Sequence, residues 1–137
     1  MTKAIFFLAV LTFAAADSRP ASAQAFSDEE FCREMTEIAK TVNRRNPSWI
    51  DRNIRNDGMA VLCLQKTIEY RIYMRVEPAN MMEDWEIRHQ AHWSLKNCQE
   101  PMLTAIRNGW RIVEILRIPR TPSHGIERQH RAVAVCG

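Results

Sequence analysis

Two histidines, His89 and His92, are the residues whose type and spacing most readily suggest chemistry. They stand three positions apart in a segment whose pattern predicts a helix, so two imidazoles could share a metal ion there. Three residues could supply a further ligand: Glu86, His124 and His130. The alternative is an exposed helical flank, on which His89 packs against Trp85 and Trp93, each four residues away.

Patterns typical of catalysis are missing from the rest of the sequence. There is no H-E-x-x-H, no G-x-S-x-G and no Gly-rich phosphate loop. We therefore expect a non-enzymatic protein without a cofactor. A metal-binding protein or metal-dependent enzyme centred on His89 and His92 remains the alternative function.

The segment from Thr67 to Val76 alternates apolar and polar residues and predicts a strand with one wet face. Its outward residues include Arg71, Tyr73 and Arg75, whose types often anchor protein interfaces, so we expect them to bind a partner. The simpler reading is cross-strand charge pairing, with Glu69 satisfied by a neighbouring arginine.

A later strand, predicted over residues 110–118, adds to this surface. If Ile112 and Leu116 face the helices, Val113 and Ile115 face outward. Apolar side chains exposed in this way often mark an interface, unless a loop covers them. A local excess of arginines follows in the sequence, which we interpret as a solvated rim: Arg111, Arg117, Arg120, Arg128 and Arg131.

Residues 1–25 have the pattern of a Sec-type signal peptide. Lys3 precedes an apolar run from Ala4 to Ala16, which is shorter than the about 20 residues of a spanning helix, and Ala-x-Ala sites follow. We expect export to the periplasm or medium, and no membrane span in residues 26–137. The formal net charge of +3 is too small to indicate nucleic-acid binding.

Four cysteines lie beyond the predicted signal peptide, and an even number in a small exported chain implies two disulfides: Cys32, Cys63, Cys98 and Cys136. Three pairings are possible. The predicted element order favours Cys32–Cys63 and Cys98–Cys136, because the first hairpin returns toward the start of the first helix and the last strand returns toward Cys98. Pairing Cys32 with Cys98 and Cys63 with Cys136 stays open.

The elements that must position these residues follow the order α-β-β-α-β-β within one domain, residues 26–137. Helices are predicted over about 28–43 and up to about Cys98, the second with Ile87, Ala91 and Leu95 on its apolar side. Asn56-Asp57-Gly58 has the composition of a turn. We expect an α+β fold with the helices on one face of a four-stranded antiparallel sheet.

Several short motifs resemble those of a loose group of small exported bacterial proteins without an assigned activity. They are Asn46-Pro47-Ser48-Trp49-Ile50-Asp51, the strand with Tyr70 and Tyr73, Asn97-Cys98-Gln99-Glu100-Pro101, and Gly109 before a strand. The resemblance implies an α+β periplasmic domain and supplies no catalytic residues. The size is also similar to that of some secretion-system pilotins, which commonly carry a lipid anchor that is not expected here.

The residues therefore predict a binding or accessory protein that docks another exported protein through its open sheet face. An inhibitor of a periplasmic enzyme would belong to the same class, and a secreted effector is a further possibility. The sequence does not identify the partner or the oligomeric state.

Overall fold

The computed structural model describes residues 25–75, 81–120 and 125–137. The predicted signal peptide lies outside these ranges except for Ala25, and His124 also lies outside them. Among the helices within the described ranges, none has both the length and the apolar character needed to cross a bilayer.

The first helix, α1 (Asp28–Asn43), begins where the sequence predicts. The Ser27 hydroxyl accepts a hydrogen bond from the Glu30 amide at 3.2 Å, which caps the first turn. Phe31, Met35 and Ala39 form its buried stripe. The helix therefore packs on the sheet through an apolar face with helical periodicity.

The sheet has five strands in the order of the sequence: β1 (Ser48–Trp49), β2 (Ile54–Leu62), β3 (Thr67–Met74), β4 (Arg111–Ile118) and β5 (Arg128–Val133). The prediction of a four-stranded antiparallel sheet is wrong in two respects. A short extra strand, β1, extends one edge, and β3 pairs with β4 in parallel, while the other pairs are antiparallel.

The parallel pair results from the connection between β3 and β4. That connection carries α2 (Trp85–Asn97) and α3 (Met102–Arg107), and it returns the chain to the end of the sheet where β3 began. The Arg111 amide there donates to the Lys66 carbonyl at 2.8 Å, so β3 and β4 start at the same level. A connection long enough to hold helices permits a parallel crossover, whereas an antiparallel hairpin needs only a short turn.

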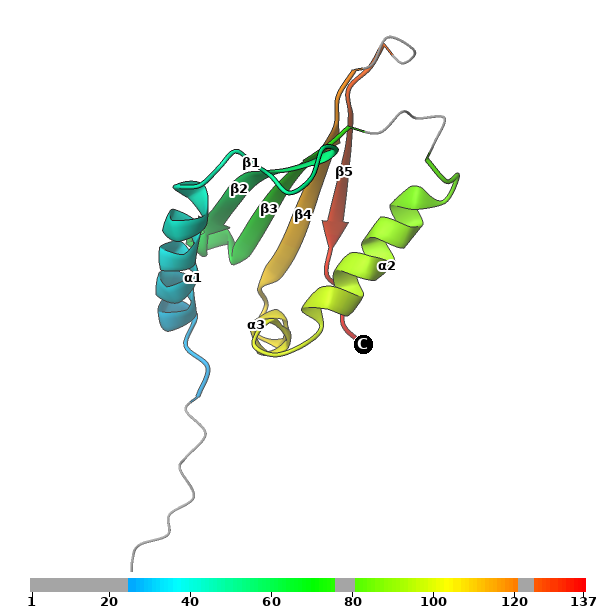
Figure 1. Cartoon of the computed structure of the whole chain (residues 1–137). Coiled ribbons are helices and arrows are strands. Elements are labelled where there is room, and N and C mark those ends of the chain that lie inside the picture. The colour runs from blue at the N-terminus through cyan, green and yellow to red at the C-terminus, as the bar shows by residue number, and fades with distance from the viewer. Residues whose placement is uncertain (1–24, 76–80, 121–124) are drawn as a thin grey trace, which may run out of the picture.

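Among the described residues, the α-helices α1, α2 and α3 lie on one face of the sheet, as predicted, and the other face is open (Figure 1). The core between the layers includes Ile68 and Ile112 from the sheet, each fully buried. It contains residues of all the helices: Phe31, Met35 and Ala39 of α1, Trp93 of α2 and Ala105 of α3.

The apolar side predicted for α2 is wrong. Ile87 and Leu95 are each 72% exposed, whereas Trp93 is 3% exposed and faces the sheet. Trp93 donates through its indole N–H to the Ile112 carbonyl at 2.9 Å. Gln90 bonds both the amide and the carbonyl of Val133, whose strand is at the sheet edge. The orientation of α2 therefore follows from burial of the Trp93 indole and from the hydrogen bonds of Gln90 to the backbone of the edge strand.

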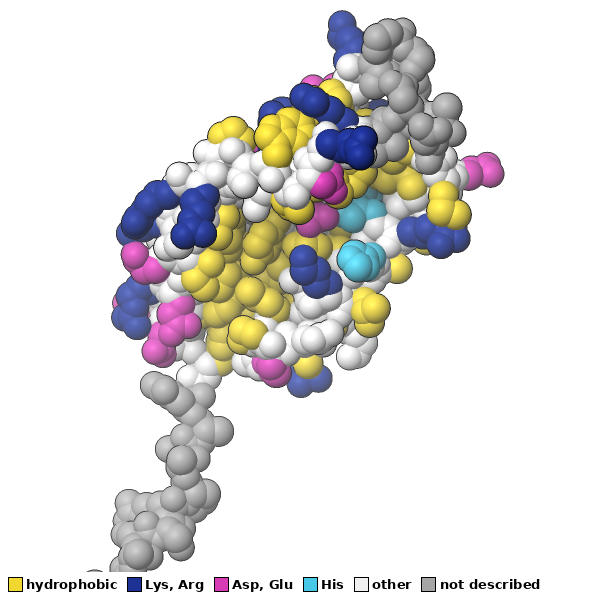
Figure 2. All heavy atoms as spheres, in the orientation of Figure 1, with side chains coloured by type: hydrophobic (Ala, Val, Ile, Leu, Met, Phe, Trp, Pro, Cys, Tyr) yellow, Lys and Arg dark blue, Asp and Glu magenta, His cyan; other side chains and the backbone are white. Residues whose placement is uncertain are grey.

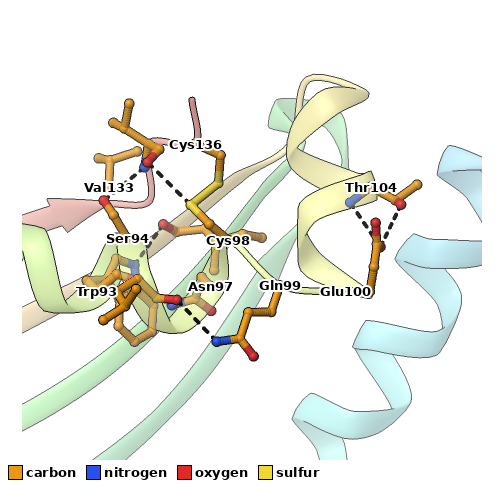
Figure 3. Close-up of a disulfide and its surroundings, with 12 residues drawn as sticks. Trp93, Ser94, Asn97, Cys98, Gln99, Glu100, Thr104, Val133 and Cys136 are labelled. Carbon is orange, nitrogen blue, oxygen red and sulfur yellow. Dashed lines mark hydrogen bonds between the residues drawn. A yellow bond between two sulfur atoms is a disulfide. The ribbon is translucent and has the colours of Figure 1, made fainter.

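Both disulfides of the favoured pairing are formed, Cys32–Cys63 and Cys98–Cys136, with Cα atoms 5.7 and 5.5 Å apart. The first joins α1 to the end of β2. The second joins the turn between α2 and α3 to the segment after β5 (Figure 3). Two disulfides are consistent with an extracytoplasmic location, where thiols oxidise and stay oxidised.

Candidate functional site

A row of four side chains crosses the open face of the sheet, one from each of β1 to β4. Trp49 lies opposite Arg55, Arg55 opposite Tyr73, and Tyr73 opposite Arg117. Directly opposed residues of neighbouring strands point to the same face of a sheet. We call Trp49, Arg55, Tyr73 and Arg117 the aromatic–arginine row, because aromatic rings and guanidinium groups alternate along it.

The side chains of the row are in stacking contact. The Arg55 guanidinium carbon lies 4.3 Å from the Tyr73 ring centre and 5.4 Å from that of Trp49. Arg117 lies 5.2 Å from the Tyr73 ring. Arg75, beyond the end of β3, has its guanidinium carbon 4.4 Å from the Trp49 ring centre. Cation–π contacts of this kind restrict the positions of the arginine side chains.

Counting Arg75 beside Trp49, three guanidinium groups and two carboxylates lie at the row. Asp57 is the carboxylate closest to it, and accepts hydrogen bonds from Arg55, with Arg117 at 3.9 Å. The hydrogen bond with Asp57 raises the pKa of Arg55 above its ordinary value. Glu127 lies 3.5 Å from Arg117 but is more than half exposed. Arg75 forms no ion pair with any of the residues that the structure describes.

Arg71 is placed differently from Tyr73 and Arg75. It lies 3.5 Å from Glu69, whose other carboxylate oxygen is 3.3 Å from Arg131 of β5. The pairing of Glu69 with neighbouring arginines, which was the simpler expectation, is therefore confirmed. Arg71 itself remains 56% exposed, so this ion pair does not remove it from the surface.

The expectation that Val113 is exposed is wrong, because it is fully buried. The Glu69–Arg131 ion pair joins β3 to β5 and so spans β4, the strand that carries Val113. Ile115, two residues further, is half-buried and lines a cavity of about 230 Å³. Arg71, Arg117 and Asp57 also line this cavity. Its lining therefore combines isoleucine side chains with two guanidinium groups and one carboxylate.

The two histidines singled out in the sequence differ in burial and in their contacts. His89 is half-buried under the sheet edge, with one ring nitrogen 2.8 Å from Glu114 and the other 2.7 Å from His130. His92 is exposed. Within residues 25–75, 81–120 and 125–137, no group of three or more His, Cys, Asp and Glu side chains is placed to hold a metal ion. The interaction of His89 with Trp85 is indirect, through His130, whose ring centre is 5.4 Å from the indole.

The contact between His89 and His130 predicts a pH-dependent stability. Burial lowers the pKa of His130 below its ordinary value of 6.5 and the nearby His89 lowers it further, while Glu86 opposes the change. As the pH falls, His130 therefore binds a proton in the unfolded chain at a higher pH than it does in the folded protein. The stability that neutral His130 contributes is present above about pH 6.5 and is lost as the pH falls through the folded pKa. The melting temperature of His130→Gln should fall less than that of the wild type between pH 7.5 and 5.

A matched variant, His92→Gln, removes an exposed imidazole from the same helix that carries His89. Its melting temperature should follow the wild-type pH profile, because His92 is not part of this contact. Circular dichroism at steps of half a pH unit measures all three proteins under the same conditions. If the melting temperatures of the wild type and His130→Gln fell in parallel with pH, His130 would not be the source of the pH dependence.

The surface predicted from the sequence includes Tyr73 and Arg75 but not Trp49, Arg55 and Arg117. Trp49 and Arg55 belong to a stretch in which the sequence shows no regular period, and Arg117 was attributed to a solvated rim. The available signal was the short spacing between Trp49 and Arg55, which is compatible with an edge hairpin that leads into the first long strand. Only the pairing of the strands β1 to β4 shows that these residues lie in one row with Tyr73.

Comparisons with known proteins extend only to the fold. No protein-family model matches the chain, and no curated protein matches it in sequence. A solved structure described as a "putative secreted protein (PA3611)" from Pseudomonas aeruginosa is similar, with a TM-score of 0.53 and 14% identity. The match covers 76% of this chain and 89% of the other. This chain thus shares its fold with a small bacterial protein of that description, which agrees with the resemblance noted from its motifs.

Proposed function

We propose that this protein is a non-enzymatic, exported binding protein that docks an acidic segment of another periplasmic or secreted protein on its open sheet face. The observation that carries the proposal is the alternation of Trp49, Arg55, Tyr73 and Arg117 in one cross-strand row. Tyr, Trp and Arg are the residue types most often responsible for binding energy at interfaces. A sheet is also a rigid support, so ordering the partner is the main entropic cost of docking.

The charges indicate what kind of segment fits. Arg75 and Arg117 lie on either side of the exposed aromatic groups, and Arg71 borders the adjacent cavity. Carboxylates of the partner would bond these guanidinium groups, and an apolar side chain would cover Trp49, which is 44% exposed. Such a surface should associate faster at low ionic strength, because screening weakens the attraction between exposed charges.

A site-specific crosslink tests the proposal. A photoreactive benzoylphenylalanine in place of Trp49 should yield a covalent adduct with a protein of the exported fraction of the source cells. The same residue in place of Leu64, which is fully exposed elsewhere, is the control and should yield none. Mass spectrometry of the adduct identifies both the partner and the segment, which we expect to be rich in Asp and Glu.

Charge reversal then measures the contribution of the arginines. Arg75→Glu together with Arg117→Glu should weaken binding to the purified partner at least about 100-fold, since an arginine at an interface hot spot contributes about 2 kcal/mol or more. Arg33→Glu with Arg107→Glu makes the same change of charge on the exposed surfaces of α1 and α3 and should leave the affinity within about threefold. Equal losses in both variants, or no adduct at position 49, would refute docking on this face.

A further inference from the structure

The opposite face of the sheet holds a second candidate site, a groove between α2 and the strands. Its volume is about 470 Å³, within the range of small-molecule sites. Figure 2 shows hydrophobic side chains gathered between α1 and α2. The groove is bounded by sheet residues and by one side of α2, and its apolar lining is: Ile54, Ile72, Met74, Met81, Met82, Trp85, Trp93 and Leu116.

The lining has the character of a site for a flexible chain rather than for a flat ring. Three methionines contribute to it, and an unbranched thioether side chain adapts its shape to what it contacts. The sheet residues Ile72 and Met74 are only half-buried, so an apolar ligand would remove further surface from water. Trp93 forms the inner wall, held by its bond to the Ile112 carbonyl.

Polar residues of the groove are concentrated on one edge. Arg88, His92 and Lys96 are spaced four apart along α2, all exposed, and we call them the α2 polar edge. Arg88 is already bonded to both carboxylate oxygens of Asp84 at 2.9 Å. Lys96 forms no ion pair in the part of the chain that the structure describes, and its ammonium group lies 5.6 Å from the Trp93 ring centre.

The remaining polar groups limit the charge of a ligand. Glu114 lines the groove and is paired with His89. Its carboxylate would repel a ligand headgroup that carries several negative charges. A single negative charge near Lys96 would lie at the end of the groove away from Glu86 and Asp84. The carboxylate nearest to Lys96 in sequence, that of Glu100, accepts hydrogen bonds from the Thr104 amide and hydroxyl and does not line the groove. The charge pattern therefore matches a monoanion attached to an apolar chain.

We propose that this groove binds a monomeric, unbranched fatty-acid-type carboxylate, with the alkyl chain over the methionines and indoles and the carboxylate at Lys96. The proposal is independent of docking on the open face, because the two sites lie on opposite sides of the sheet. It adds a small-molecule ligand to a protein whose other surface is proposed to bind a protein partner.

Calorimetry with octanoate, decanoate and dodecanoate, each below its critical micelle concentration, tests the chain. Each added CH₂ that enters the groove should raise the affinity by up to about fourfold, the equivalent of about 0.8 kcal/mol per buried methylene. The protein is purified after export, with both disulfides formed. Affinity that does not change with chain length would overturn the proposal.

Head-group specificity is tested with three dodecyl compounds, the carboxylate, the alcohol and the trimethylammonium. Dodecanoate should bind tightest. Lys96→Glu should weaken dodecanoate at least about 10-fold while leaving dodecanol within about twofold. The matched control is Lys40→Glu on α1, another exposed lysine, which should leave all three affinities within about twofold. Equal affinity for dodecanoate and dodecyltrimethylammonium would overturn the proposal.

A second variant locates the bound chain. Met82 is 58% exposed at the groove, so Met82→Glu is expected to fold, as circular dichroism can verify, and should weaken dodecanoate and dodecanol alike by about 10-fold or more. Unchanged affinity would place the ligand elsewhere and refute the site. Binding to phosphatidylglycerol vesicles without binding to free dodecanoate would also overturn the proposal, because it would indicate a membrane surface as the occupant.

Discussion

Replacing Cys98 and Cys136 together by serine is expected to lower the free energy of unfolding by about 4 kcal/mol. The two cysteines are 38 residues apart, and closing a loop of that length removes about this much conformational freedom from the unfolded chain. A small domain has a total stability of about 5 to 15 kcal/mol, so the variant should keep only part of its stability. Guanidinium unfolding followed by circular dichroism measures the loss.

The contacts beside this disulfide predict where the loosened structure appears. The Val135 amide donates to the Ser94 hydroxyl at 3.1 Å, and Ala134 is part of the core. Hydrogen exchange should therefore accelerate first in the segment after β5 and at the end of α2 (Figure 3).

Replacing Cys32 and Cys63 by serine is the matched variant, with a separation of 31 residues and a similar expected loss. It should accelerate exchange in α1 and at the end of β2 instead. In the wild type, no thiol should react with a sulfhydryl dye after denaturation without reductant. Reactive thiols there, or a loss below about 1 kcal/mol in either variant, would contradict a domain that depends on two disulfides.

The pairing of the cysteines could be predicted because it depends on coarse geometry. The order of elements places each cysteine near one end of the sheet, and that order was correct apart from β1. The same coarse reasoning did not give the direction of β4 relative to β3. Whether β4 runs parallel or antiparallel to β3 depends on whether the helical connection crosses the sheet. The pattern of polar and apolar side chains contains no information on that crossing.

Side-chain orientation was predictable where the repeat was regular. β3 alternates without interruption, so Tyr73 and Arg75 were placed on the open face and Ile72 on the helix face from the sequence alone. For α2 the apolar pattern was misleading. Ile87 and Leu95 are exposed because the aromatic residue Trp93 and the amide of Gln90 make specific bonds to the sheet, and hydrophobic periodicity does not include such bonds.

β2 shows the clearest limit of reading a period from sequence. Asn56-Asp57-Gly58 was interpreted as a turn, but these residues lie within the strand at a bulge, where the register with β3 shifts between Asn56 and Gly58. The extra residue reverses the alternation. As a result, Ile54 lines the groove and Met59 joins the core on the same face, although their positions differ by five, an odd number that would place them on opposite faces of a regular strand.

Gly58 makes this bulge possible, and Gly58→Ala is expected to lower the free energy of unfolding by about 3 to 4 kcal/mol. Its φ of +114° is a conformation that side chains other than glycine rarely adopt, at a cost of about 1 to 3 kcal/mol. An added Cβ would also lie 2.7 Å from the Asn43 side-chain oxygen. That oxygen accepts from the Met59 amide at 2.9 Å, while the Asn43 amide donates to the Met59 carbonyl at 2.8 Å. Displacing Asn43 loses these bonds, which adds about 1 to 3 kcal/mol.

The control is Gly125→Ala, where an added Cβ meets no atom within 4 Å and the stability should change by less than about 0.5 kcal/mol. Asn43→Ala separates the two causes, because it removes the bonds to Met59 without straining Gly58. The double variant should therefore lose less than the sum of the single ones. Additive losses would show that the added methyl group does not act on Asn43.

Gly58 also connects the two proposed sites, because the bulge sets both faces of β2 at once. Arg55 and Asp57 point to the open face of the sheet, whereas Ile54 lines the groove on the opposite face. If Gly58→Ala shifts the register instead of unfolding the domain, partner binding at the aromatic–arginine row and dodecanoate binding in the groove should weaken together. Loss of one with full retention of the other would mean that the bulge does not position both surfaces.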